Sequence, residues 1–253
     1  MKKIILFGLL CFVIASCQKK NAPPAITTPT STSTSASSSL VYGSLEVMQP
    51  HFYYNGVYTA YPNNVVYCFF SSTGIYSMNS MDNIPGGTIT LNTVQLYHYT
   101  GPNNFAYQYH DTTLTLYNPP FNWNVAGSGI IPAFSVSIND AFPICNNTSL
   151  IPDTISISHG INVPISGAGA DSVSLAICLN TDNAGGSKTK TFAITNNSVS
   201  FTAKEVSDFF AISAEKYRSI RLSYTKYTIQ TFNGKKIAFK TTTYYDRNVT
   251  QTP

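Results

Sequence analysis

The sequence contains no Lys or Arg between residues 21 and 187, and it has only three Glu in its whole length, Glu46, Glu205 and Glu215. Because Glu is a good helix former, its scarcity disfavours a helical fold. Thr, Ser, Asn, Val, Ile and Tyr dominate instead, and they favour strands and turns. Apolar residues make up 43% of the chain and aromatic residues 13%, which is enough to bury a core and excludes a disordered chain. The composition therefore predicts an all-β protein.

The chain also lacks an apolar run long enough to cross a bilayer. Its longest run extends from Ile4 to Ala15, whereas a spanning helix needs roughly 20 residues. The run follows Lys2 and Lys3 and ends in small residues, which is the layout of a removable secretory signal. We therefore expect residues 1–16 to be a signal peptide.

The signal ends in the four residues Ile14, Ala15, Ser16 and Cys17. They resemble the lipobox of bacterial lipoproteins, in which the bond before the cysteine is cut and the new N-terminal Cys carries acyl chains. The resemblance implies lipid attachment at Cys17, a membrane as partner and a place in the cell envelope. Several chains anchor firmly, because each buried methylene contributes about 0.8 kcal/mol. Gln18 stands where lipoproteins held at the inner membrane often show Asp, so the resemblance favours the outer membrane and leaves the exposed face open.

Behind the lipobox, residues 17–39 are mostly Pro, Ala, Thr and Ser, which is typical of a flexible, disordered tether. The remaining body is long enough for two domains. We expect two tandem β-sandwich domains, an N-terminal one at 40–150 and an immunoglobulin-like one at 151–253.

Short strand-like runs separated by Pro, Gly and Asn turns support the first sandwich. The expected strands are Leu45–Met48, Val65–Phe70, Thr88–Leu91, Val94–Tyr99, Ala106–Tyr117, Asn122–Ala126 and Ala133–Ile138. Six residues near the end of this segment resemble an element of bacterial lipoproteins that place an immunoglobulin-like domain behind it: Trp123, Val125, Gly127, Gly129, Pro132 and Phe134.

The second segment alternates apolar and polar residues more regularly, as in Val173–Leu179. Asn233-Gly234 lies between two strand-like runs and predicts a hairpin. Thr202 and Glu205 form a capping-box pattern that predicts one short helix. About seven strands in roughly 100 residues resemble an immunoglobulin-like fold, which implies no activity.

The two segments carry opposite charge. Residues 21–187 contain seven acids and no base, whereas residues 188–253 contain eleven Lys or Arg and four acids. Such a basic segment can meet nucleic acid, anionic glycan or lipid headgroups. Its bases, however, are spaced along strand-like residues among Thr and Tyr. We interpret it as the solvated face of a sheet and expect no nucleic-acid partner.

Three cysteines remain after the signal and the lipobox: Cys68, Cys145 and Cys178. Their spacing matches no metal motif. Cys68 and Cys178 lie in apolar runs, where Cys commonly acts as a small buried hydrophobe. A Cys68–Cys145 disulfide is chemically allowed in the export compartment, and the sequence does not decide whether it forms.

The histidines offer no obvious metal site. His98 and His110 belong to one predicted hairpin, but a register that pairs Tyr99 with Ala106 places them on opposite faces. Only a one-residue slip would align them. We expect no metal and no other cofactor.

No catalytic motif is present either, because the chain has no G-x-S-x-G sequence and its few acids show no linking pattern. We therefore predict a protein that is not an enzyme. The alternative is an envelope hydrolase acting on glycan or peptide, with Asp111 and Asp140 as the residues to test.

Aromatic side chains give the best indication of function. A cluster around one Asn-, Gln- and Thr-rich hairpin forms the candidate ligand site: Tyr97, Tyr99, Phe105, Tyr107, Tyr109 and Trp123. Rings can cover the C–H patches of a sugar while amides and hydroxyls bond its hydroxyl groups. The alternative is that these rings fill the core. We expect a non-catalytic binding or structural role in the cell envelope, with a carbohydrate or an envelope protein as ligand.

Overall fold

The computed structural model describes residues 30–31, 40–60, 64–74, 83–101, 104–111, 118–179, 186–210 and 218–252. The signal peptide and the lipobox with Cys17 lie outside the described residues, as does most of the predicted tether. The described part of the tether is β1 (Thr30–Ser31), a two-residue strand that pairs with the later strand β18.

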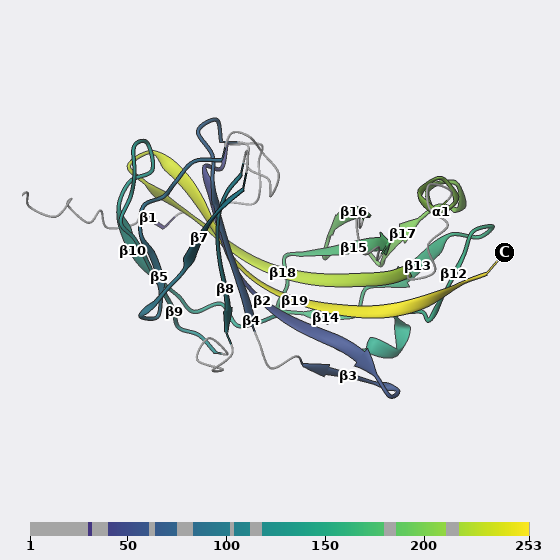
Figure 1. Cartoon of the computed structure of the whole chain (residues 1–253). Coiled ribbons are helices and arrows are strands. Elements are labelled where there is room, and N and C mark those ends of the chain that lie inside the picture. Colours follow the sequence, from purple (N-terminus) through teal and green to yellow (C-terminus); the bar gives the residue numbers. More distant parts are fainter. Residues whose placement is uncertain are drawn as a thin grey trace, which may run out of the picture.

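The protein is all-β, as the composition predicts, and most of its strands belong to one large sheet (Figure 1). The main path of this sheet runs, in spatial order, through β16 (Gly186–Ala193), β15 (Ser172–Leu179), β18 (Arg218–Phe232), β19 (Lys235–Thr252), β2 (Gly43–Tyr54), β4 (Asn64–Phe70), β8 (Asn104–Asp111) and β7 (Tyr97–Gly101). Two further short strands, β3 (Val57–Ala60) and β12 (Thr154–Ser156), pair with β2 and β19.

Smaller sheets cover the main sheet. Four strands form the first cover, in the order β10 (Phe134–Ile138), β9 (Phe121–Val125), β5 (Ile89–Leu91) and β6 (Val94–Gln95). The second half of the body contains two two-stranded sheets. One pairs β13 (Ile161–Pro164) with β17 (Ser198–Phe201), and the other pairs β11 (Ile144–Cys145) with β14 (Gly167–Ala168). The strands expected from the sequence are thus largely confirmed.

The long hairpin of β18 and β19 connects the two halves of the body, and Figure 1 shows both strands running along the molecule. Its turn is Asn233-Gly234, with φ values of 46° and 76°, as the hairpin prediction requires. The 15-residue β18 and the 18-residue β19 pair from Phe232 and Lys235 at the turn to Arg218 and Val249.

The body contains two hydrophobic cores, and the hairpin contributes to both. The first core combines β2, β4 and the four-stranded sheet with Phe232, Ile237 and Phe239 of the hairpin. The second core includes Tyr245 and Val249 of the same strand, β19. Residues at odd positions of β19 face one side of the sheet, so both cores lie on that side. Because one sheet spans both cores, the domain boundary at residue 150 and the immunoglobulin-like second domain stay predictions.

The predicted capping box is confirmed at the start of α1 (Ala203–Phe210). The Thr202 amide donates to Glu205 Oε2 at 2.9 Å, and the Glu205 amide donates to Thr202 Oγ1 at 3.3 Å. Lys190 also donates to this carboxylate at 2.6 Å. The Lys190 bond and the Thr202 amide lower the pKa of Glu205 to about 2. The helix thereby packs Val206 and Phe210 into the second core.

Ion pairs join the acidic and basic segments of the chain. Asp171 of the base-free segment binds Lys226 at 3.1 Å, and Asp153 lies 3.6 Å from Arg247. Arg221 binds Asp246 on the neighbouring strand at 2.6 Å. These three bases are therefore each paired with a carboxylate.

All three body cysteines are free thiols. Cys68 lies in the first core and Cys145 in the second, so the disulfide left open by the sequence does not form. Burial raises the pKa of the Cys68 thiol well above its ordinary value, which makes it a poor nucleophile.

Candidate functional site

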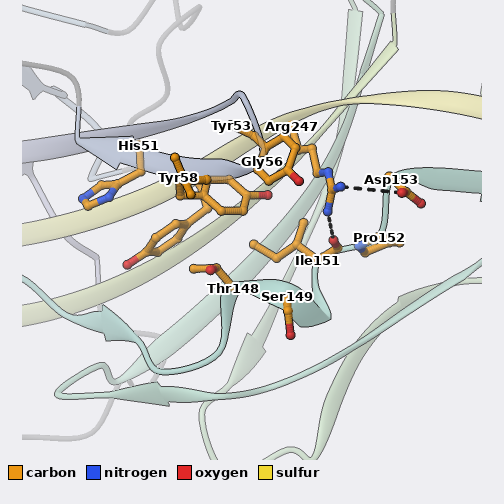
Figure 2. Close-up of a pocket in the computed structure, with 12 residues that line it drawn as sticks. His51, Tyr53, Gly56, Tyr58, Thr148, Ser149, Ile151, Pro152, Asp153 and Arg247 are labelled. Carbon is orange, nitrogen blue, oxygen red and sulfur yellow. Dashed lines mark hydrogen bonds and ion pairs between the residues drawn. The ribbon is translucent and has the colours of Figure 1, made fainter.

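A pocket of about 640 Å³ opens where the main sheet separates from the segment around the 3₁₀ helix η1 (Thr148–Leu150), as Figure 2 shows. This volume lies in the range of about 300–1,000 Å³ typical of small-molecule sites. The sheet supplies one wall, formed by His51, Tyr53, Tyr58, Tyr245 and Arg247. The opposite wall includes Thr148, Ser149 and Asp153.

The hairpin of β2 and β3 places two of these tyrosines. Its turn is Asn55-Gly56, with φ values of 48° and 86°, and Tyr53 pairs with Tyr58 across the hairpin. Because side chains alternate along a strand, both rings face the pocket, whereas Tyr54 points to the other face and is 72% exposed. This hairpin was not among the strands predicted from the sequence. The Asn-Gly rule that identifies the β18–β19 turn would also have found it.

Ring-to-ring contacts hold the aromatic wall in place. The ring of Tyr58 meets the rings of Tyr53 and Tyr245 edge to face, with centroid distances of 5.1 and 5.5 Å. The His51 ring lies 4.8 Å from that of Tyr245. Tyr245 is fixed further, because its hydroxyl oxygen accepts a bond from the Cys145 amide at 3.1 Å. The wall is therefore ordered before any ligand arrives.

The hydroxyl group of Tyr58 is buried and has no hydrogen-bond partner in the described part of the chain. Burial raises the pKa of Tyr58, so the group stays protonated and can donate. A buried polar group without a partner is uncommon in folded proteins, and each one requires an explanation. Since the oxygen has almost no exposed surface, an acceptor on a bound ligand would satisfy this hydroxyl once the ring or its neighbours shift to admit it.

The charged side chains of the pocket, Arg247 and Asp153, already interact with other groups of the protein. Arg247 Nη1 donates to the Ile151 carbonyl at 2.6 Å, and its guanidinium lies 3.9 Å from the centroid of the Tyr53 ring. The same guanidinium pairs with Asp153 (Figure 2). Burial lowers the pKa of His51, which favours its neutral form at pH 7. The pocket thus suits an uncharged ligand.

Hydroxyl groups on η1 complete the site. The Asn147 side chain accepts bonds from the Ser149 amide at 3.1 Å and from the Ser149 hydroxyl at 2.6 Å. This short-range cap fixes the turn that carries Thr148 and Ser149. The pocket therefore combines aromatic rings on one wall with hydroxyl groups on the other.

The residues predicted from the sequence lie elsewhere and do not form one exposed cluster. Trp123 and Tyr107 are each 3% exposed in the first core, and the Tyr107 hydroxyl oxygen accepts a bond from the Gly86 amide at 2.9 Å. Tyr97 is 72% exposed and stacks on the half-buried Tyr109 with ring centroids 6.3 Å apart.

The remaining two candidates are placed by their backbones alone. Tyr99 pairs with Ala106, and Phe105 pairs with Thr100. Their side chains lie outside the described part of the structure.

The same strand register bears on the two histidines that were considered for a metal site. Tyr99 pairs with Ala106, and His98 therefore lies opposite Tyr107 rather than opposite His110. This is the register in which the sequence places the two histidines on opposite faces. Among the described residues, no group of three or more His, Cys, Asp or Glu side chains is arranged to hold a metal ion.

Of the two acids named for a hydrolase, Asp140 accepts a bond from the Thr228 hydroxyl at 2.7 Å. The side chain of Asp111 is outside the described residues. His159 Nδ1 lies 3.1 and 2.9 Å from the hydroxyl oxygens of Ser156 and Ser158, in an exposed turn outside the 640 Å³ pocket.

Comparisons with protein-family models, curated proteins and solved structures gave no match for this chain. Within the described ranges, no helix has the length and apolar character needed to span a membrane.

Proposed function

We propose that this protein is a lipid-anchored lipoprotein of the cell envelope, held in the outer membrane, that binds an uncharged saccharide without turning it over. The observation that carries the binding role is the unpaired, buried Tyr58 hydroxyl in a pocket with an aromatic wall. Sugars offer C–H faces to aromatic rings and hydroxyl groups to polar side chains. A saccharide hydroxyl is therefore a suitable acceptor for Tyr58.

The neutral character of the pocket supports the ligand class. Arg247 is bound by Ile151 and Asp153, so a carboxylate or phosphate on the ligand would have to displace these partners. A neutral ligand leaves the pairing intact. Anionic glycans are disfavoured for the same reason.

The envelope location is supported by the signal sequence and by Ile14-Ala15-Ser16-Cys17. Replacing Cys17 with Ala is expected to move the protein from the membrane fraction to the soluble extracytoplasmic fraction, because the acyl chains are its anchor. Fractionation of cells that express either form, followed by immunoblotting, measures this shift. A Cys17→Ala protein that stayed with the membrane would contradict lipid anchoring.

Tyr58→Phe tests the binding site, because it keeps the ring and removes the unpaired hydroxyl. A neutral glycan array identifies the saccharides that bind, and calorimetry then measures the affinity of each one. We expect Tyr58→Phe to bind them about tenfold more weakly, which corresponds to the loss of one or two hydrogen bonds. The free energy of unfolding is expected to stay equal or to rise, because a buried polar group without a partner is removed.

Tyr54→Phe is the matched control, since it removes the hydroxyl of an exposed tyrosine on the other face of the same β2–β3 hairpin. Its affinity is expected to equal that of the wild type. If Tyr58→Phe bound the saccharides as well as the control did, the pocket would not be their site. Release of a hydrolysis product during the binding assay would instead identify the protein as a hydrolase.

A further inference from the structure

A shallow groove of about 520 Å³ lies on the outer face of the four-stranded sheet. Alternation along β9 buries Phe121, Trp123 and Val125 and turns Asn122 and Asn124 outward. The strand register places Thr90 and Ser135 beside Asn124, and Ser137 beside Asn122. Side chains that end in amides or hydroxyls thus meet across three adjacent strands.

None of the described side chains that line this groove carries a charge. The Ser135 hydroxyl donates to Asn124 Oδ1 at 2.7 Å, which leaves the Asn124 amide nitrogen to donate outward. The side chains of Asn122, Thr90 and Ser137 make no hydrogen bond within the described part of the chain. Neighbouring strands lie about 4.8 Å apart, so donors and acceptors recur across the groove at a spacing close to the width of one sugar ring.

The turn at the end of the groove is strained. Asn92 and Thr93 connect β5 to β6 with φ values of 53° and 100°. A two-residue turn of this kind favours Gly at its second position, and a β-branched residue at positive φ is an outlier. The Asn92 side chain holds the turn, because its Oδ1 accepts a bond from the Asn122 amide at 2.8 Å. Strained residues that their surroundings hold in place tend to lie at ligand sites.

We propose that this groove is a second binding site for a neutral saccharide chain, separate from the pocket beside η1. Asn122, Asn124 and Ser137 bond its hydroxyl groups, and the Thr93 turn limits one end of the site. This inference rests on the groove's own residues and goes beyond the proposed function of the pocket. A protein with both sites would bind two saccharide units at once.

Trp123 makes the proposal directly testable, since it is the only tryptophan of the chain and it borders the groove. The mature protein is titrated with neutral oligosaccharides of glucose, mannose, galactose and N-acetylglucosamine while tryptophan emission is recorded. We expect a saturable change in emission with at least one of them. In Tyr58→Phe the emission titration is expected to be unchanged, which separates the groove from the pocket.

The Asn122→Ala/Asn124→Ala double variant is expected to bind at least tenfold more weakly in the emission titration. Asn162→Ala is the matched control, because Asn162 is likewise an exposed strand residue between two buried ones, Ile161 and Val163, and lines neither cavity. Its titration should match the wild type. If no oligosaccharide changed the emission of the wild type, or if the control lost as much affinity as the double variant, the groove proposal would be wrong.

Discussion

Replacing Phe239 with Ala is expected to destabilise the protein by about 3–5 kcal/mol, the usual cost of emptying a buried Phe site. Phe239 is fully buried, and its ring meets those of Phe134 and Phe232 at centroid distances of 6.0 and 6.1 Å. It also lies on β19, which continues into the second core. We therefore expect both cores to unfold in one cooperative transition, at a lower urea concentration than in the wild type.

Two probes measure this coupling during urea unfolding. Trp123 fluorescence reports the first core, and hydrogen exchange of β15 amides reports the second. The two transitions are expected to shift together in Phe239→Ala. Tyr54→Ala, which truncates an exposed ring of the same sheet, serves as the control and should leave both midpoints in place. A shift confined to the Trp123 signal would show two independent domains, as the boundary at residue 150 predicts.

Replacing Arg247 with Met is expected to lower the free energy of unfolding by about 2–4 kcal/mol. The estimate combines a charged hydrogen bond to a backbone carbonyl, worth about 1.5–3 kcal/mol, with a partly buried cation–π contact worth about 0.5–2 kcal/mol. The Arg247 side chain is 12% exposed and joins β19 to the segment that carries η1. Its loss frees that segment, so saccharide affinity at the pocket should fall with stability.

Urea unfolding and calorimetric titration of the Met variant check both parts of this expectation. Lys204→Met is the control, because Lys204 is 82% exposed and its pair with Asp208 is screened by solvent. It should change neither quantity measurably. An Arg247→Met protein with wild-type affinity would mean that the η1 segment is held by other contacts and that the ion pair does not shape the pocket.

Local signals in the sequence were sufficient for most of the secondary structure. Alternation of apolar residues identified strands such as β15, and the Asn233-Gly234 and Thr202–Glu205 patterns identified a turn and a helix start. These features depend on neighbours within a few residues, so a local rule can recover them. The all-β class follows from the same signals.

The sharing of one sheet by two cores had no local signal. Strand pairing between β2 and β19 depends on contacts such as that of Glu46 with Thr242, 196 residues apart. Alternation shows which side chains are buried but not which strands are neighbours. For this reason alternation alone could not show that the main sheet contributes to both cores, and the two tandem sandwiches stay a prediction.

The candidate site was harder to predict, because aromatic rings serve both cores and binding sites. Trp123 and Tyr107 stand in a polar hairpin region but point inward. The pocket tyrosines Tyr53 and Tyr58 flank an Asn-Gly turn in a segment that is also rich in rings, but their role depends on η1, which is distant in the chain. Composition can identify a ring-rich segment, but burial decides which rings meet solvent.

The parallel pairing of β2 with β19 sets an order for folding. Among the described strands, β2 precedes β19 by about 190 residues, so the centre of the main sheet cannot close until residues 235–252 have been synthesised. Contacts this distant in sequence slow the search for the native state and leave strand edges unpaired in the meantime. Newly made chains should therefore depend on protection from aggregation until β19 is in place.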